Sequence, residues 1–163
     1  MSRMILICLA LLGGLALSAP ISRADDDVAK TLRLLYFDGK FSEAKEVLAA
    51  APQEVRDDAG LRRALGDAAL KWVKRQEGLA RKAGLTAARE SFGAARALDP
   101  TDADSVEKSL AATIELTELA IEAKNGEHAQ TAAAWGITEG EKALEGGADT
   151  PAIRLALADA YAI

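Results

Sequence analysis

The chain of 163 residues is acidic, with 25 aspartates and glutamates against 20 lysines and arginines and a net charge of −5. This balance argues against a nucleic-acid-binding surface, which requires a basic face, and against attachment to an anionic membrane. Alanine, leucine, glutamate, lysine and arginine dominate the composition while β-branched residues are few, so an all-α protein is predicted.

The first 24 residues have the features of a secretory signal peptide. A basic opening at Arg3 precedes an apolar run over residues 4–17, and Ser22 and Ala24 supply the small residues expected before a cleavage site. The run is about 14 residues long, whereas a membrane-spanning helix needs roughly 20. We therefore expect cleavage near Ala24, a mature chain in the periplasm or outside the cell, and no membrane span thereafter; an uncleaved anchor is the alternative. The only cysteine, Cys8, lies inside this leader, so the mature chain would have no disulfide and no thiolate.

Three prolines divide residues 25–163 into units of similar length. Pro52, Pro100 and Pro151 are separated by 48 and 51 residues, and each precedes a new helical pattern. A near-constant period of this size is typical of arrays of helical hairpins. The first hairpin is expected over residues 28–50, with its turn at residues 38–40.

The second unit is predicted to begin with a long helix that starts at Asp57 or Asp58 and ends at Gly84, with a break at Gly66 as an alternative. Its second helix ends before Pro100.

The third unit is predicted to begin at Asp102 or Asp104 and to reverse at Asn125. Its second helix follows over residues 127–145, and a last helix opens at Pro151. The apolar face of its first helix is expected to consist of Val106, Leu110, Ile114, Thr117 and Ile121.

One helix carries small, large and small residues on a single face. Ala88 and Ala95 would let a neighbouring helix approach closely, and Phe92 would fill the gap between them. Trp72 stands sixteen residues before Ala88, on the preceding helix. This pattern resembles the second half of a tetratricopeptide repeat, with Trp72 at the place of the large residue of the first helix. A similar first-helix pattern recurs near the end of the chain, at Leu157, Ala158 and Tyr161.

The resemblance implies a tetratricopeptide-like α-solenoid of antiparallel hairpins over residues 25–163, whose first helices line a concave face. The family's repeat has about 34 residues, so the period near 50 implies longer hairpins. The last helix has no partner within the sequence, and we expect the array to continue beyond residue 163. Carried over from the family, the ligand-facing positions are Val73, Glu77, Ala80, Arg81, Leu155 and Asp159. The alternative for Glu77 and Arg81, which are four residues apart, is a surface ion pair.

Two further sets of residues allow both a structural and a functional interpretation. Asp99, Asp102 and Asp104 surround Pro100 and are interpreted as helix caps, with a calcium site as the alternative. His128, the only histidine, is interpreted as a solvated residue near a helix start rather than as a general base or metal ligand.

The two tryptophans also have two interpretations. Trp72 and Trp135 are expected to fill gaps between packed helices, and platforms that stack on sugars or peptides are the alternative.

These features favour an exported protein–protein interaction scaffold that holds a peptide or protein in a concave helical groove, without catalytic activity, metal or cofactor. One alternative is the N-terminal helical domain of a larger envelope enzyme. Another is a structural protein of the cell envelope without a defined ligand. The partner and the oligomeric state are left open by the sequence.

Overall fold

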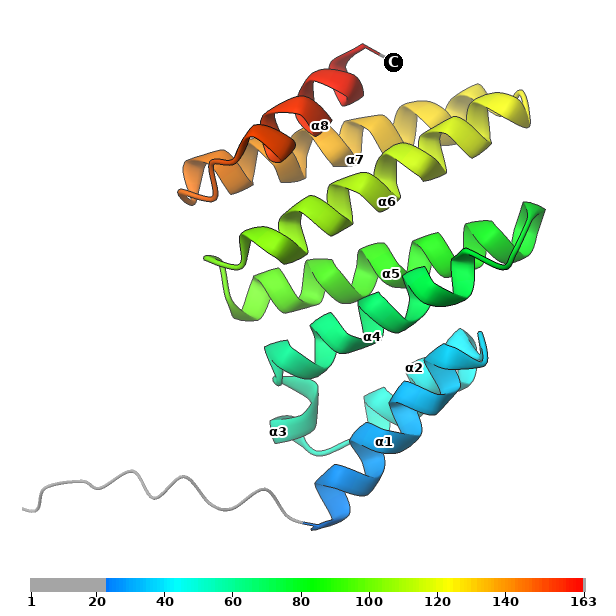
Figure 1. Cartoon of the computed structure of the whole chain (residues 1–163), viewed down its shortest axis with the longest axis vertical. Helices are drawn as coiled ribbons and strands as arrows, with labels where there is room; N and C mark the ends of the chain where they lie inside the picture. Colours follow the sequence, from blue (N-terminus) through cyan, green and yellow to red (C-terminus); the bar gives the residue numbers. More distant parts are fainter. Residues whose placement is uncertain (1–22, 163) are drawn as a thin grey trace, which may run out of the picture.

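The computed structural model describes residues 23–162, all of whose regular elements are helices (Figure 1). The all-α prediction is therefore confirmed, whereas the predicted leader up to residue 22 lies outside the described residues. The helices are α1 (Arg23–Phe37), α2 (Phe41–Ala50), α3 (Gln53–Arg56), α4 (Ala59–Val73), α5 (Gly78–Leu98), α6 (Ala103–Glu122), α7 (Gly126–Glu145) and α8 (Pro151–Tyr161). The single turn α3, after Pro52, is an element that the sequence patterns did not predict.

The helices pack in sequence order along the long axis of the molecule, from α1 at one end to α8 at the other (Figure 1). From α4 onward each helix packs on the next, and α1 also contacts α4 while α6 contacts α8. Side-chain contacts join α4 to α6 and α5 to α7. Alternate helices therefore neighbour one another, with α1, α4, α6 and α8 on one side and α2, α5 and α7 on the other.

The predicted small, large and small face of α5 is completely buried. Ala88, Phe92 and Ala95 are each 0% exposed. The ring of Phe92 lies against Gly66 of α4, where an added Cβ would come within 2.7 Å of the ring. Gly66 is therefore a point of close helix approach and not a break, and α4 passes through it without interruption.

The turn between α4 and α5 is not at Gly84, and that prediction is wrong. The first helix ends at Val73, and α5 begins at Gly78, whose φ of +54° favours glycine. Gly84 lies inside α5 and is buried, because Val73 and Trp72 pack directly on its backbone. The glycine that looked like a helix stop instead allows the two arms of the hairpin to meet.

Trp72 fills the space between two hairpins, as predicted. Its indole covers both Gly39 and Gly84, where an added Cβ would lie 2.4 Å and 2.8 Å from ring atoms. Phe41 packs on it edge to face, with the ring centroids 5.2 Å apart. The aromatic cluster fastens α1 and α2 to the α4–α5 hairpin.

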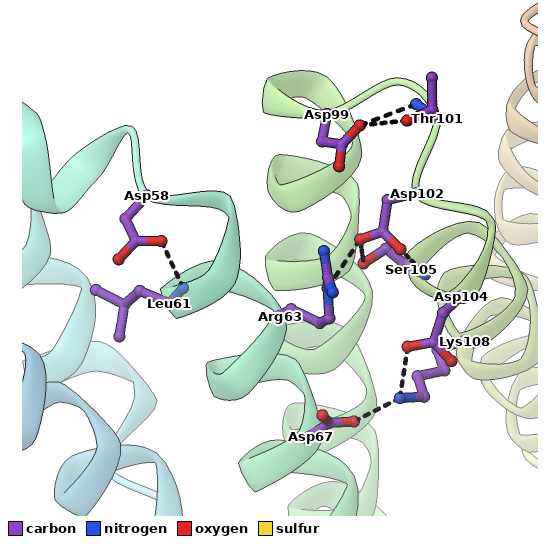
Figure 2. A network of polar contacts seen from close by, with 10 residues as sticks. All are labelled: Asp58, Leu61, Arg63, Asp67, Asp99, Thr101, Asp102, Asp104, Ser105 and Lys108. Atoms are coloured by element: carbon purple, nitrogen blue, oxygen red, sulfur yellow. Dashed lines mark hydrogen bonds and ion pairs between the residues drawn. The ribbon is translucent and has the colours of Figure 1, made fainter.

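A polar network joins the start of α6 to α4 (Figure 2). Asp102 is the N-cap of α6 and accepts from the amide of Ser105 at 3.2 Å and from its hydroxyl. Arg63 Nε lies 2.9 Å from Asp102 Oδ2, close enough for an ion pair but outside hydrogen-bond geometry. Lys108 Nζ lies 3.0 Å from Asp67 Oδ1 and 2.8 Å from Asp104 Oδ2.

The capping interpretation of the acidic cluster around Pro100 is confirmed for Asp102. Asp99 accepts from the amide and hydroxyl of Thr101 at 3.1 Å and 2.7 Å, so it too is held by local protein donors (Figure 2). Among residues 23–162, no group of three histidine, cysteine or acidic side chains could hold a metal ion.

The ionisation of Asp102 is expected to make this network sensitive to acid. Burial opposes its ionisation, but the hydrogen bonds from Ser105 and the charge of Arg63 outweigh burial and hold the pKa of Asp102 below its ordinary value of 3.8. A carboxyl group with a lowered pKa stabilises the fold above its unfolded pKa and ceases to do so as the pH falls through its folded pKa. We therefore expect Asp102→Asn to lower the free energy of unfolding by about 1 kcal/mol at pH 7 and by less below pH 3.8.

The measurement is urea unfolding followed by circular dichroism at pH 7, 5 and 3. Asn keeps an oxygen that can accept from the Ser105 amide, but its amide nitrogen cannot accept from the Ser105 hydroxyl, so the variant removes the charge together with one hydrogen bond. Only the contribution of the charge should change with pH. Asp159→Asn, at an exposed position of α8, is the control and should leave unfolding unchanged. An equal difference between wild type and Asp102→Asn at pH 7 and pH 3 would contradict the prediction.

Candidate functional site

A groove runs between α5 and α7. Both helices pack on α6 and run antiparallel to it, so they are parallel to each other. The facing stripe of α5 repeats at helical spacing and contains Lys82, Thr86, Arg89, Gly93 and Arg96. The facing stripe of α7 contains His128, Thr131, Trp135, Glu139 and Lys142. We refer to the space between these two stripes as the α5/α7 groove.

The α5/α7 groove consists of three adjoining cavities of about 330, 210 and 520 Å³. The first two share Lys82 and His128, and the last two share Arg89. Leu116, Leu119 and Ala120 of α6 form the apolar floor of the first two cavities. The groove therefore combines a hydrophobic base with polar walls, an arrangement typical of ligand-binding sites.

Two contacts bridge the groove and fix the register of its walls. The guanidinium of Arg89 lies 4.9 Å from the ring centroid of Trp135, within the range of a cation–π interaction. Arg96 donates to Glu139, which Lys142 Nζ also approaches to 3.2 Å. Trp135 is half-buried, and Arg89 covers one face of its indole. Trp135 also lines the largest of the three cavities of the groove, which leaves it accessible to a ligand.

His128 lies in the first turn of α7, as predicted, and is exposed. Its Nδ1 is 2.8 Å from Nδ2 of Asn125, the N-cap of the helix, and its amide donates to the Asn125 side chain. His128 lines the first two cavities of the groove.

In addition to the three cavities of the α5/α7 groove, a further cavity of about 390 Å³ is lined by two of the predicted ligand-facing residues. Glu77 and Arg81 line it together with Glu115, Glu118 and Glu122, the last three from α6. Arg81 forms its ion pair with Glu115, at 2.6 Å, and not with Glu77 four residues earlier. The local ion pair that was the alternative for Glu77 and Arg81 is therefore replaced by an ion pair between α5 and α6.

The other predicted ligand-facing residues are dispersed. Val73 is buried against Gly84. Ala80 is half-buried near the start of α5, while Leu155, 64% exposed, and Asp159 lie on the surface of α8. Neither Leu155 nor Asp159 lines a cavity with Glu77 or Arg81 in the described part of the chain.

The α5/α7 groove was not predicted from the sequence. A signal was present, since Lys82, Arg89 and Arg96 recur every seven residues and must share one helix face. His128, Trp135 and Lys142 repeat the same spacing 46 residues later. What the pattern could not indicate is that these two stripes face each other, because that depends on how α6 packs on both helices.

Comparison with protein-family models, with curated proteins and with solved structures gives no match. None of the described helices combines the length and hydrophobicity that are needed to cross a bilayer. The likeness to tetratricopeptide repeats remains a prediction from the residues that carry it.

Proposed function

We propose that this protein is an exported, non-enzymatic scaffold of tetratricopeptide-like hairpins that holds a segment of another protein. After removal of a leader near Ala24, the mature chain acts in the periplasm or outside the cell, and it does so by binding. The observation that carries this proposal is the continuous α5/α7 groove, with its apolar floor and its Arg89–Trp135 wall.

The dimensions and chemistry of the groove support a peptide segment as its occupant. At a rise of 1.5 Å per residue, Lys82 and Arg96 are about 21 Å apart along α5. An extended chain advances about 3.3 Å per residue, so roughly six residues would occupy this length. Tryptophan and arginine are among the residues that contribute most to protein interfaces, because they bury a large area and still offer directed polar contacts.

The groove lies between second helices of successive hairpins, whereas the family resemblance put the ligand on the first helices. Three adjoining cavities lie along α5 and α7. The proposal therefore assigns the working surface to these two helices.

Two threonines of α7 provide a matched test. Thr131 and Thr138 are both exposed, and each hydroxyl donates to the carbonyl four residues earlier, at 2.8 Å and 3.0 Å. Thr131 lines the middle cavity, while Thr138 lines none of the cavities described. We expect Thr131→Trp to fill the groove and abolish capture of a partner from envelope extract, and Thr138→Trp to leave capture intact.

Capture is measured by affinity purification and quantitative mass spectrometry, with circular dichroism as the check that both variants fold. A protein that is enriched by wild type and Thr138→Trp but lost with Thr131→Trp supports the proposal. Equal capture by all three proteins, or no enriched protein with wild type, overturns it.

A further inference from the structure

The α5/α7 groove is basic although the chain that carries it is acidic. Its walls contain Lys82, Arg89, Arg96 and Lys142 against only two carboxylates, Glu90 and Glu139. The whole chain, in contrast, has a net charge of −5. An acidic partner would therefore be repelled by the net charge of the chain and attracted to the cations of this groove, which favours docking here.

The two carboxylates of the groove are already neutralised by the protein itself. Glu90 pairs with Lys45 of α2 at 2.7 Å, and Glu139 pairs with Arg96 and Lys142. Among residues 23–162, neither Lys82 nor Arg89 forms an ion pair. Lys82 can therefore receive a carboxylate from outside, and Arg89, although it lies over the Trp135 ring, still has N–H donors in the plane of its guanidinium for another.

The spacing of the cations fits an extended chain. Lys82, Arg89 and Arg96 follow one another every seven residues, which is about 10.5 Å along a helix. In an extended peptide of polyproline II conformation, residues three positions apart lie on the same side of the chain and are separated by about 9 Å, whereas in a β-strand they would point to opposite sides. Carboxylates at every third position of a peptide lying along α5 would thus meet successive cations of the groove.

We propose that the α5/α7 groove binds an extended acidic segment of a partner protein, with carboxylates at every third residue meeting Lys82 and Arg89. This inference rests on the proposed function and adds the chemistry of the partner. Between the two cations, the apolar floor at Leu116 and Ala120 accommodates the intervening side chains.

A peptide fits this groove better than a nucleic acid does. A single strand carries a phosphate at every nucleotide, but of the cations that line the groove only Lys82 and Arg89 form no ion pair within residues 23–162, so most phosphates would lack a partner. A peptide can place uncharged residues between the two that meet these cations. The discrimination comes from unfavourable contacts with the wrong ligand as much as from favourable contacts with the right one.

The test uses fluorescein-labelled nine-residue peptides and the purified protein, with binding followed by anisotropy. The probe has three repeats of Glu-Ser-Thr, and its neutral counterpart has three repeats of Gln-Ser-Thr. A third peptide has the same composition as the first but with its three glutamates adjacent, and oligothymidylate of nine nucleotides represents nucleic acid. We expect the spaced acidic peptide to bind about tenfold more tightly than either other peptide or the oligonucleotide, with an affinity that falls as salt rises.

Two exposed lysines that form no ion pair within residues 23–162 provide matched variants. Lys82→Glu reverses a charge inside the groove, and Lys30→Glu makes the same change on α1, outside it. We expect Lys82→Glu to weaken binding of the spaced acidic peptide about tenfold and Lys30→Glu to change it less than about twofold.

Equal binding of the spaced acidic and neutral peptides would overturn the inference, as would equal weakening by Lys82→Glu and Lys30→Glu. Tighter binding of oligothymidylate than of the acidic peptide would replace it with a nucleic-acid site. If Thr131→Trp still abolishes capture of a partner while the acidic peptide does not bind, the acidic-segment inference is wrong and the scaffold proposal stands.

Discussion

Replacement of Phe92 by alanine is expected to lower the free energy of unfolding by about 3–5 kcal/mol. Phe92 is fully buried in α5 and its ring fills the space over Gly66 of α4. Alanine would lose the transfer free energy of the ring and leave a cavity. The cavity would remain because the other side chains between α4 and α5 prevent the two helices from closing over it. Urea unfolding followed by circular dichroism measures the change. Leu98→Ala, at a position 41% exposed on the same helix, should cost much less.

The contact between Phe92 and Gly66 also predicts that the effects of substitutions at these two residues are coupled. In the wild type, Gly66→Ala would put a Cβ within 2.7 Å of the Phe92 ring, and overpacking of this kind costs about 1–3 kcal/mol. In the Phe92→Ala background the ring is gone, and the better helix propensity of alanine should make Gly66→Ala neutral or stabilising. Additive effects in this double-mutant cycle would show that Phe92 does not rest on Gly66.

The second large effect concerns two glycines of α5. Replacing each of them by alanine is expected to change the free energy of unfolding in opposite directions. At Gly84 an added Cβ would lie 2.5 Å from Val73 Cγ2 and 2.8 Å from Trp72 Cε3. At Gly93 nothing lies within 4 Å of an added Cβ. We therefore expect Gly84→Ala to destabilise the protein by about 1–3 kcal/mol and Gly93→Ala to stabilise it by up to about 1 kcal/mol.

Thermal and urea unfolding of the two variants give this comparison directly. Helix propensity favours alanine at both positions, so a difference in sign isolates the packing of the hairpin. If Gly84→Ala were as stable as Gly93→Ala, the close contact of Trp72 and Val73 with α5 would be contradicted.

The order and approximate bounds of the helices could be predicted because they depend on local features. Composition, the spacing of Pro52, Pro100 and Pro151, and the caps at Asp102 and Asn125 all act within a few residues. Local features failed at Gly84, since a glycine that ends a helix and one that admits a neighbouring helix look alike in a sequence.

The buried face of α6 shows a second limit. Ile121, expected to be inward, is 52% exposed, while Thr117 is buried as expected and Thr113, which was not on the predicted face, is buried as well. Their hydroxyls donate to carbonyls four residues earlier, at 2.8 Å and 2.9 Å, so burial leaves neither hydroxyl without a partner. Because α6 packs between α5 and α7, its buried face is broader than a single apolar stripe.

The sequence by itself determined that this protein is helical, where its hairpins are divided, and that Phe92 is a core residue. The sequence also contained the seven-residue spacing of the basic residues on α5, but it did not indicate that they line a groove. Only the tertiary structure decided that α5 and α7 lie side by side, that Arg89 meets Trp135 and that Arg81 pairs with Glu115. The physical reason is that helix formation is governed by neighbours along the chain, whereas a groove exists only where helices distant in sequence are brought together by packing on a third.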